Sequence, residues 1–364
     1  MLIWFVVGYL LITVGIGLYA STRVHNSKDF AAGGRSMSFP LVMAMVFATW
    51  FGSEAVLGIP ATFIEEGFAG IVEDPFGSFG CLMLVGIFFA RKLYRMNLLT
   101  IGDFFRKRFG PNVELITSLV IMASYLGWIA AQLTALGVVF NVLSDGSISI
   151  TQGMLMGTAI VLIYTLFGGM WSVALTDTFQ MAIIVVGLGY LTWLIGDMAG
   201  GPQKVISQAA SEGKFTFINS FDARDIVAFI GAAVTMMLGS IPQQDVFQRM
   251  TSAKDEKTAM HGTILGAAAY LIIAAIPIYI AFAALMAHPE LAQLFASEDA
   301  REIQRILPDL VLGKMPVWAQ VMFFGALLSA ILSTASGALL APTATFTENV
   351  LRPFVPHMSD RQFL

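Results

Sequence analysis

The sequence is poor in the residue types on which metal-dependent enzymes and disulfide-stabilised proteins depend. Only 12% of its 364 residues are charged, and it contains four histidines and one cysteine. The single Cys81 cannot form an intrachain disulfide. The sequence shows no His, Cys, Asp and Glu cluster with metal-ligand spacing, which argues against a metal-dependent enzyme.

A general base for serine chemistry is also missing from the apolar parts of the chain. An intramembrane serine hydrolase needs a His or Lys beside its buried serine. No Lys lies well inside an apolar stretch, and the histidines lie in expected loops or at span ends: His25, His261, His288 and His357. We therefore predict that the chain is not an enzyme.

Apolar residues are abundant, at 57% of the chain, a share that no soluble domain of this length tolerates on its surface. We predict an all-α polytopic membrane protein with nine spans. The first span lacks a basic n-region and a cleavage site, so we interpret it as a retained helix. The spans cover residues 2–20, 39–64, 72–90, 113–143, 149–168, 177–196, 225–248, 262–287 and 315–350.

The placement of basic residues predicts the orientation. With the N-terminus outside, 14 of the 20 basic residues lie in inward loops, as the positive-inside rule requires. We expect a multi-pass protein of the cell (inner or plasma) membrane, with the lipid bilayer and no nucleic acid as partner. The inward residues are Arg23, Lys28, Arg35, Arg91, Lys92, Arg95, Arg106, Lys107, Arg108, Arg249, Lys254, Lys257, Arg352 and Arg361.

Three acidic residues lie within or at the ends of expected spans. Glu54 is inside the second span, Asp177 at the mouth of the sixth and Asp245 near the inner end of the seventh. Intramembrane carboxylates are costly and indicate function by default. As alternatives, Asp177 caps its helix, and Glu54 faces a water-filled vestibule without touching a ligand.

Two spans contain helix-breaking residues. The second span has Gly52 and Gly58 before Pro60, and the seventh has Gly239 before Pro242. A pair of broken helices is typical of a transporter's central site, because unwound backbone offers free carbonyls and amides. Alternatively, these residues mark only kinks or close packing.

The last span carries a stripe of hydroxyl groups in the stretch LLSAILSTASGALL. Ser329, Ser333, Ser336 and Gly337 share one helical face, with Thr334 beside them. Hydroxyl oxygens at membrane depth suit a hard cation such as sodium. The alternative is that these small residues only permit close helix packing.

Five motifs, in their order and positions, resemble the sodium/solute symporter family, which includes sodium-coupled proline, sugar, sialic acid and choline carriers. The resemblance implies a LeuT-like five-plus-five inverted repeat preceded by one extra helix. The motifs are GGRS (33–36), ATWFGSEAVLGIP (48–60), GGMWSVALTDTFQ (168–180), IPQQDVFQR (241–249) and LLSAILSTASG (327–337).

The resemblance also implies a division of the chain. Residues 1–38 would hold the extra helix and a cytoplasmic loop, 39–197 the first five-helix repeat, and 198–364 an incomplete second repeat of three helices. Two helices of a complete core are then absent, so we expect either a fragment or an atypical protein.

By the same resemblance, the chain performs sodium-coupled uptake of a small organic solute by alternating access. The alternative is a membrane solute sensor built on a transporter fold. The implied sodium ligands are the carbonyls of Ala48, Phe51 and Ala330 and the hydroxyls of Ser333 and Thr334. In sialic acid carriers the matching residues hold a second sodium, which here implies Asp177, Ser333 and Ser336.

The solute site matches the family only in part. The chain resembles the choline-carrier branch, and Trp50 and Trp128 match two walls of an aromatic cage for quaternary amines. Gln243 stands where that branch has Trp, so an amine, an amino acid and a carboxylate all stay open as solutes. The expected substrate-binding residues are Trp50, Ser53, Glu54, Trp128, Gln132, Gln243, Gln244 and Asp245.

Overall fold

The computed structural model describes residues 2–218, 220–292 and 299–355. Arg361 and His357, both used in the sequence analysis, lie outside the described residues, as does the end of the chain. The described part forms helices and no β-strand; an isolated bridge joins Met37 to Ala253. The prediction of an all-α protein is therefore confirmed for this part of the chain.

The number of spans differs from the prediction of nine. Six described helical segments are long and apolar enough to cross a membrane, or seven if the bent pair α11 (Ala223–Gly239) and α12 (Gln244–Thr251) forms one span. The six are α1 (Leu2–Ser21), the segment Val72–Arg95, α8 (Pro111–Leu143), α9 (Ile150–Met198), α13 (Glu256–Ala287) and the segment Val317–Phe354, which contains α16 (Val317–Thr345).

Two local features of the backbone contribute to the smaller number of spans. The expected span 39–64 is divided into α3 (Phe39–Ala48), a π-helical turn (Glu54–Gly58) and α4 (Ile59–Glu66), each too short to cross alone. The expected spans 149–168 and 177–196 both lie in the segment α9, in which two helices meet at a kink at Gly169. Gly169 has φ +47° and faces Phe30, so a side chain there would be both strained and obstructed.

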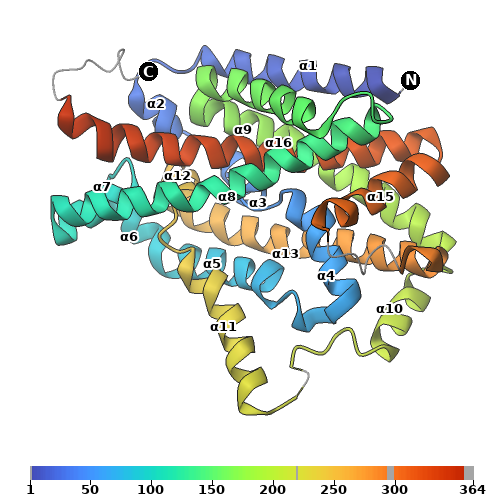
Figure 1. The fold of residues 1–364 in the computed structure, drawn as a ribbon. Coiled ribbons are helices and arrows are strands. Elements are labelled where there is room, and N and C mark those ends of the chain that lie inside the picture. The colour runs from blue at the N-terminus through green and yellow to red at the C-terminus, as the bar shows by residue number, and fades with distance from the viewer. Residues whose placement is uncertain (1, 219, 293–298, 356–364) are drawn as a thin grey trace.

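Helix α16 lies at the centre of the long helices, packed against α9 and α8 (Figure 1). The most apolar window of its segment is 94% buried within the protein, compared with 22% for the peripheral α1. Small residues allow the close approach: a Cβ at Gly187 of α9 would lie 2.5 Å from the Met322 carbonyl of α16. The hydroxyl stripe on α16 is therefore internal.

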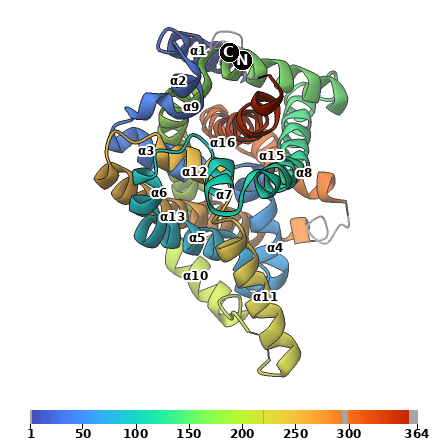
Figure 2. The same cartoon turned by 90° about the vertical axis from the view of Figure 1, so that its left-hand side faces the viewer.

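The remaining helices surround this centre. Helix α13 packs against α3, and α11 projects away from the long helices without burying any residue (Figures 1 and 2). The short helices are α2 (Ser27–Ala32), α5 (Ser78–Leu84), α6 (Ala90–Arg95), α7 (Ile101–Phe109), α10 (Pro202–Ser211) and α15 (Ala300–Lys314).

Candidate functional site

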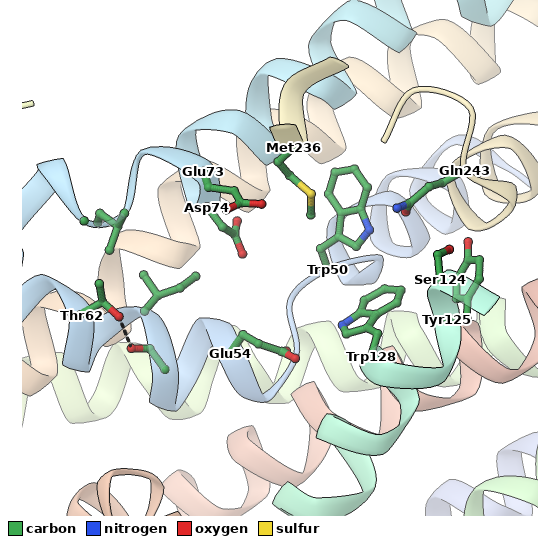
Figure 3. A pocket seen from close by; sticks show the side chains of 14 residues that line it. Trp50, Glu54, Thr62, Glu73, Asp74, Ser124, Tyr125, Trp128, Met236 and Gln243 are labelled. Atoms are coloured by element: carbon green, nitrogen blue, oxygen red, sulfur yellow. Dashed lines mark hydrogen bonds between the residues drawn. The ribbon is translucent and has the colours of Figure 1, made fainter. Parts of the chain in front are cut away.

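A cavity of about 460 Å³ opens between the break after α3, the start of the segment Val72–Arg95, and helices α8 and α11 (Figure 3). Four of the expected substrate-binding residues line it: Trp50, Glu54, Trp128 and Gln243. The two predicted helix breaks thus meet at one cavity. The bend between α11 and α12 measures 47°, and Gln243 is the residue just before α12.

Two further expected residues lie behind the cavity wall. The Gln132 amide donates to Glu54 Oε2 at 2.6 Å, and its oxygen accepts the Ser53 backbone N–H at 3.1 Å. Neither Gln132 nor Ser53 lines the cavity. Gln132 instead holds the Glu54 carboxylate in position and satisfies an amide freed by the broken helix.

Gln244 and Asp245 also lie outside the cavity lining and attach α12 to its neighbours. Gln244 Oε1 accepts the Ile101 N–H at 2.8 Å. The Tyr125 hydroxyl donates to Asp245 Oδ1 at 2.7 Å and accepts the Asp245 N–H at 3.0 Å. Both residues therefore fix the helix break in place, and the structure does not bring them to the cavity.

The cavity contains residues that the sequence analysis did not single out, among them Tyr125, Glu73 and Asp74. Asp74 Oδ1 accepts a hydrogen bond from the Tyr270 hydroxyl at 2.5 Å. The sequence does contain an indication of this acidic site, since two adjacent acidic residues precede Pro75 at the start of an apolar span. Their position beside Trp50 follows from the tertiary arrangement, which sequence spacing does not specify.

The broken end of α3 meets the hydroxyl stripe of α16. In a continuous α-helix the Gly52 N–H would bond to the Ala48 carbonyl, but it bonds to Trp50 O at 2.9 Å. Ala48 O instead accepts from the Thr334 hydroxyl at 3.4 Å. Carbonyl and hydroxyl oxygens without a net charge are ligands that suit a sodium ion, so this donor set fits one.

The other residues of the expected sodium sites are buried nearby. Phe51 and Ala330 are fully buried, so their carbonyls lie in the protein interior. The Ser333 hydroxyl donates to Asp177 Oδ1 at 2.6 Å, and the Ser336 hydroxyl donates to the Ser333 carbonyl at 2.8 Å. Ser333 therefore faces Asp177 in this structure, and Ser336 bonds within its own helix.

The structure contradicts two expectations about charged residues. Asp177 lies within helical backbone well past the kink at Gly169, where the second helix of α9 begins, so the helix-capping alternative is wrong. Arg249, assigned to an inward loop from the sequence, is 2% exposed, and its Nη2 lies 3.8 Å from Asp177 Oδ2. The reason is that the short helix α12 packs against α16 and carries Arg249 inside.

The chain matches the sodium:solute symporter family over residues 30–363 and belongs to it. It is therefore a multi-pass membrane protein of a transporter family.

Among curated relatives, it is 27% identical to high affinity choline transporter 1 of Homo sapiens, over 100% of this chain and 64% of that protein. It is 28% identical to the Drosophila melanogaster high-affinity choline transporter 1, over 94% of this chain and 55% of that one. It is 25% identical to sodium-coupled monocarboxylate transporter 1 of Mus musculus, over 97% and 59%. The chain thus spans just over half to two thirds of the length of these relatives.

A solved structure confirms the fold. The chain resembles a Na⁺-coupled sialic acid symporter in its substrate-bound outward-open state, with a TM-score of 0.85 and 21% identity. The match covers 100% of this chain and 76% of that one. The resemblance shows a shared LeuT-like fold, as the sequence motifs implied.

Proposed function

We propose that this chain carries out sodium-coupled uptake of a small organic amine by alternating access. One observation carries the proposal: Thr334 of α16 meets the Ala48 carbonyl at the broken end of α3, and Trp50, two residues further, lines the cavity. An ion bound at the break would therefore act directly on the solute site. The relatives named above are all transporters, which favours this function over a solute sensor.

Sodium is the proposed coupling ion. At the main site the broken helix supplies neutral carbonyls and α16 supplies hydroxyls, a combination that binds a hard cation without burying an anion. Binding would order the residues between α3 and the π-helical turn, and so stabilise the solute site. The proposed ligands are Ala48, Phe51, Ala330, Ser333 and Thr334.

The charge of the cavity favours an amine over a carboxylate or an amino acid. Glu54, Glu73 and Asp74 line it, and none of the described lining residues is Lys, Arg or His. Trp50 and Trp128 add aromatic faces that attract a cation. A solute carboxylate would face like charges without a basic partner.

We also propose a second cation position at Asp177, with Ser333 and Ser336. Because Arg249 already pairs with Asp177, a sodium ion there would bind in competition with the guanidinium. Asp245 lies one turn before Arg249 on α12, and its Oδ2 has no hydrogen-bond partner. It is the carboxylate towards which a displaced Arg249 could turn.

The orientation and repeat boundaries remain proposals. The excess of basic residues in inward loops supports an outside N-terminus. The repeats would cover residues 39–197 and 198–364, after an extra helix within 1–38.

The driving force is sufficient for accumulation. One sodium ion crossing 100 mV gains about 2.3 kcal/mol and a tenfold gradient adds about 1.4, so a neutral solute could be concentrated roughly 500-fold. A protonated amine would also be driven inward by the potential itself.

Uptake into proteoliposomes tests the proposal. With outside sodium, radiolabelled organic amines should accumulate above equilibrium, and replacement of sodium by potassium should abolish accumulation. Uptake of monocarboxylates and amino acids should stay at the level of empty liposomes. Sodium-independent equilibration of every solute would contradict the proposal.

A further inference from the structure

The cavity has acidic side chains in one region and aromatic side chains in another. Glu73 and Asp74, from the π-helical segment Val72–Gly77, lie on one side of the Trp50 indole, and Trp128 and Gln243 lie on the other (Figure 3). Asp74 is within electrostatic range of both Glu54 and Glu73. The cavity therefore has an acidic end and an aromatic end.

The acidic end has no cation of its own among the described lining residues. Two of the carboxylates accept hydrogen bonds from neutral donors: Asp74 from the Tyr270 hydroxyl at 2.5 Å and Glu54 from the Gln132 amide at 2.6 Å. Neutral donors solvate a carboxylate but leave its charge in place. A sodium ion at Ala48 and Thr334 would bring one positive charge to a cavity lined by three acidic side chains, so the site favours a solute with more than one positive charge.

The aromatic end offers a separate position for a cation that can donate hydrogen bonds. Gln243 Oε1 is a buried acceptor with no hydrogen-bond partner among the described residues. Trp50 and Trp128 provide the ring faces around it. A protonated primary amine can donate an N–H to Gln243 while lying against an indole, whereas a quaternary ammonium group cannot donate.

We propose that the solute is a short aliphatic diamine, bound as a dication along the cavity. One ammonium group lies between Trp50 and Trp128 and donates to Gln243, and the methylene chain passes Trp50. The other ammonium group makes charge-assisted hydrogen bonds to Glu73 and Asp74. This inference rests on the proposed transport function and names the solute class of the same site.

Equilibrium binding in sodium separates this inference from the proposed function. Putrescine, n-butylamine, choline and lysine would be titrated calorimetrically into the purified protein in lipid nanodiscs, where no membrane potential acts. We expect putrescine to bind at least about tenfold more tightly than n-butylamine, because only the dication reaches the acidic end. Lysine should bind more weakly than putrescine, since its carboxylate meets like charges.

Substitutions at the acidic end give the second measurement. Glu73→Gln and Asp74→Asn should each reduce the preference for putrescine over n-butylamine towards one. Glu73 is exposed, and its side chain has no hydrogen bond or ion pair within the described part of the chain, so it stays informative if Asp74→Asn disturbs the contact with Tyr270 and unfolds the protein. Glu65→Gln is the matched control: Glu65 is exposed at the end of α4, does not line the cavity, and its replacement should leave the preference unchanged.

The outcomes are distinct. Equal affinity for putrescine and n-butylamine, both dependent on sodium, would overturn the diamine and leave the proposed amine transport standing. A preference that persists in Glu73→Gln and Asp74→Asn would also overturn it. Sodium-dependent binding of none of these amines would overturn both proposals.

Discussion

The guanidinium of Arg249 lies 3.8 Å from the Asp177 carboxylate, and both side chains are buried in the interior of the protein. Arg249 comes from α12 and Asp177 from α9, while Ser333 of α16 donates to the other Asp177 oxygen. Gly337 leaves the space that the guanidinium fills, since a Cβ there would collide with it. The protein thus supplies its own cation at the carboxylate for which the sequence implied a second sodium.

Removal of that cation should make folding depend on sodium. Loss of one partner of a buried ion pair costs about 3–5 kcal/mol, because the other charge is left uncompensated. We expect Arg249→Gln to melt at a lower temperature in potassium, and sodium to raise its melting temperature more than that of the wild type. Thermal unfolding in nanodiscs measures both.

The double variant Arg249→Gln with Asp177→Asn is the control, since it removes both charges and should lose the additional response to sodium. If Arg249→Gln responds to sodium no more than the wild type, a cation does not replace the guanidinium at Asp177.

The contact between Thr334 and Ala48 predicts how uptake depends on the sodium concentration. Thr334→Ala removes one oxygen ligand from the proposed main site. If that ligand contributes about 1.4 kcal/mol to sodium binding, the sodium concentration for half-maximal uptake should rise about tenfold. Proteoliposome uptake at a fixed solute concentration gives this value. Thr343→Ala is a control on the same helix: Thr343 is exposed and bonds only to the Leu339 carbonyl. Equal sodium dependence in both variants would remove Thr334 from the site.

Sequence could predict the broken helices because their causes are local. The second span breaks around Gly52, after α3 ends at Ala48, and Gly239 before Pro242 ends α11, whereas Gly58 and Pro60 lie in helical backbone beyond the first break. Trp50 and Thr334 were singled out through the family resemblance, and their residue types suit a cation, so their roles as ligands stay predictions.

Long-range packing could not be predicted in this way. The burial of Arg249 depends on how α12 packs against α16, and a basic residue after a span looks like a loop residue to the positive-inside rule. The expected number of spans also differs, because residues 149–168 and 177–196 belong to one helical segment, α9, in which two helices meet at a kink at Gly169. Glu73 and Asp74 are candidate site residues only because the fold places them at the same cavity as Trp50, which lies far from them in the sequence.

Gly52 should be intolerant of a side chain. A Cβ at this position would lie 2.8 Å from Gln132 Oε1 and 3.0 Å from both Gln132 Nε2 and Glu54 Oε2, the two atoms that form the hydrogen bond beside the cavity. We expect Gly52→Ala to weaken solute binding by about tenfold or more, because it displaces the Glu54 carboxylate. Gly127→Ala on α8 is the control, since a Cβ there meets nothing within 4 Å. Calorimetric titration of both variants with putrescine gives the comparison, and unchanged affinity in Gly52→Ala would show that the position of Glu54 does not matter for binding.

Gln243 should determine whether the cavity binds amines that donate hydrogen bonds more tightly than quaternary amines. The residue lies just before α12 at the cavity, and its side-chain oxygen is buried without a partner. Gln243→Trp would replace this acceptor by a third aromatic wall beside Trp50 and Trp128, as in the choline-carrier branch that the sequence resembles. A cation–π contact in a desolvated site contributes about 2 kcal/mol, whereas a lost hydrogen bond to a charged group costs about 1.5–3 kcal/mol. Choline should therefore gain at least about tenfold in affinity and putrescine should lose a similar factor.

Competition of choline and of putrescine against a radiolabelled amine in sodium measures both changes in affinity. Gln243→Leu provides the matched variant, because it removes the acceptor without adding a ring and should weaken putrescine without improving choline. If Gln243→Trp and Gln243→Leu change the two affinities alike, the aromatic end of the cavity does not select the solute through this residue.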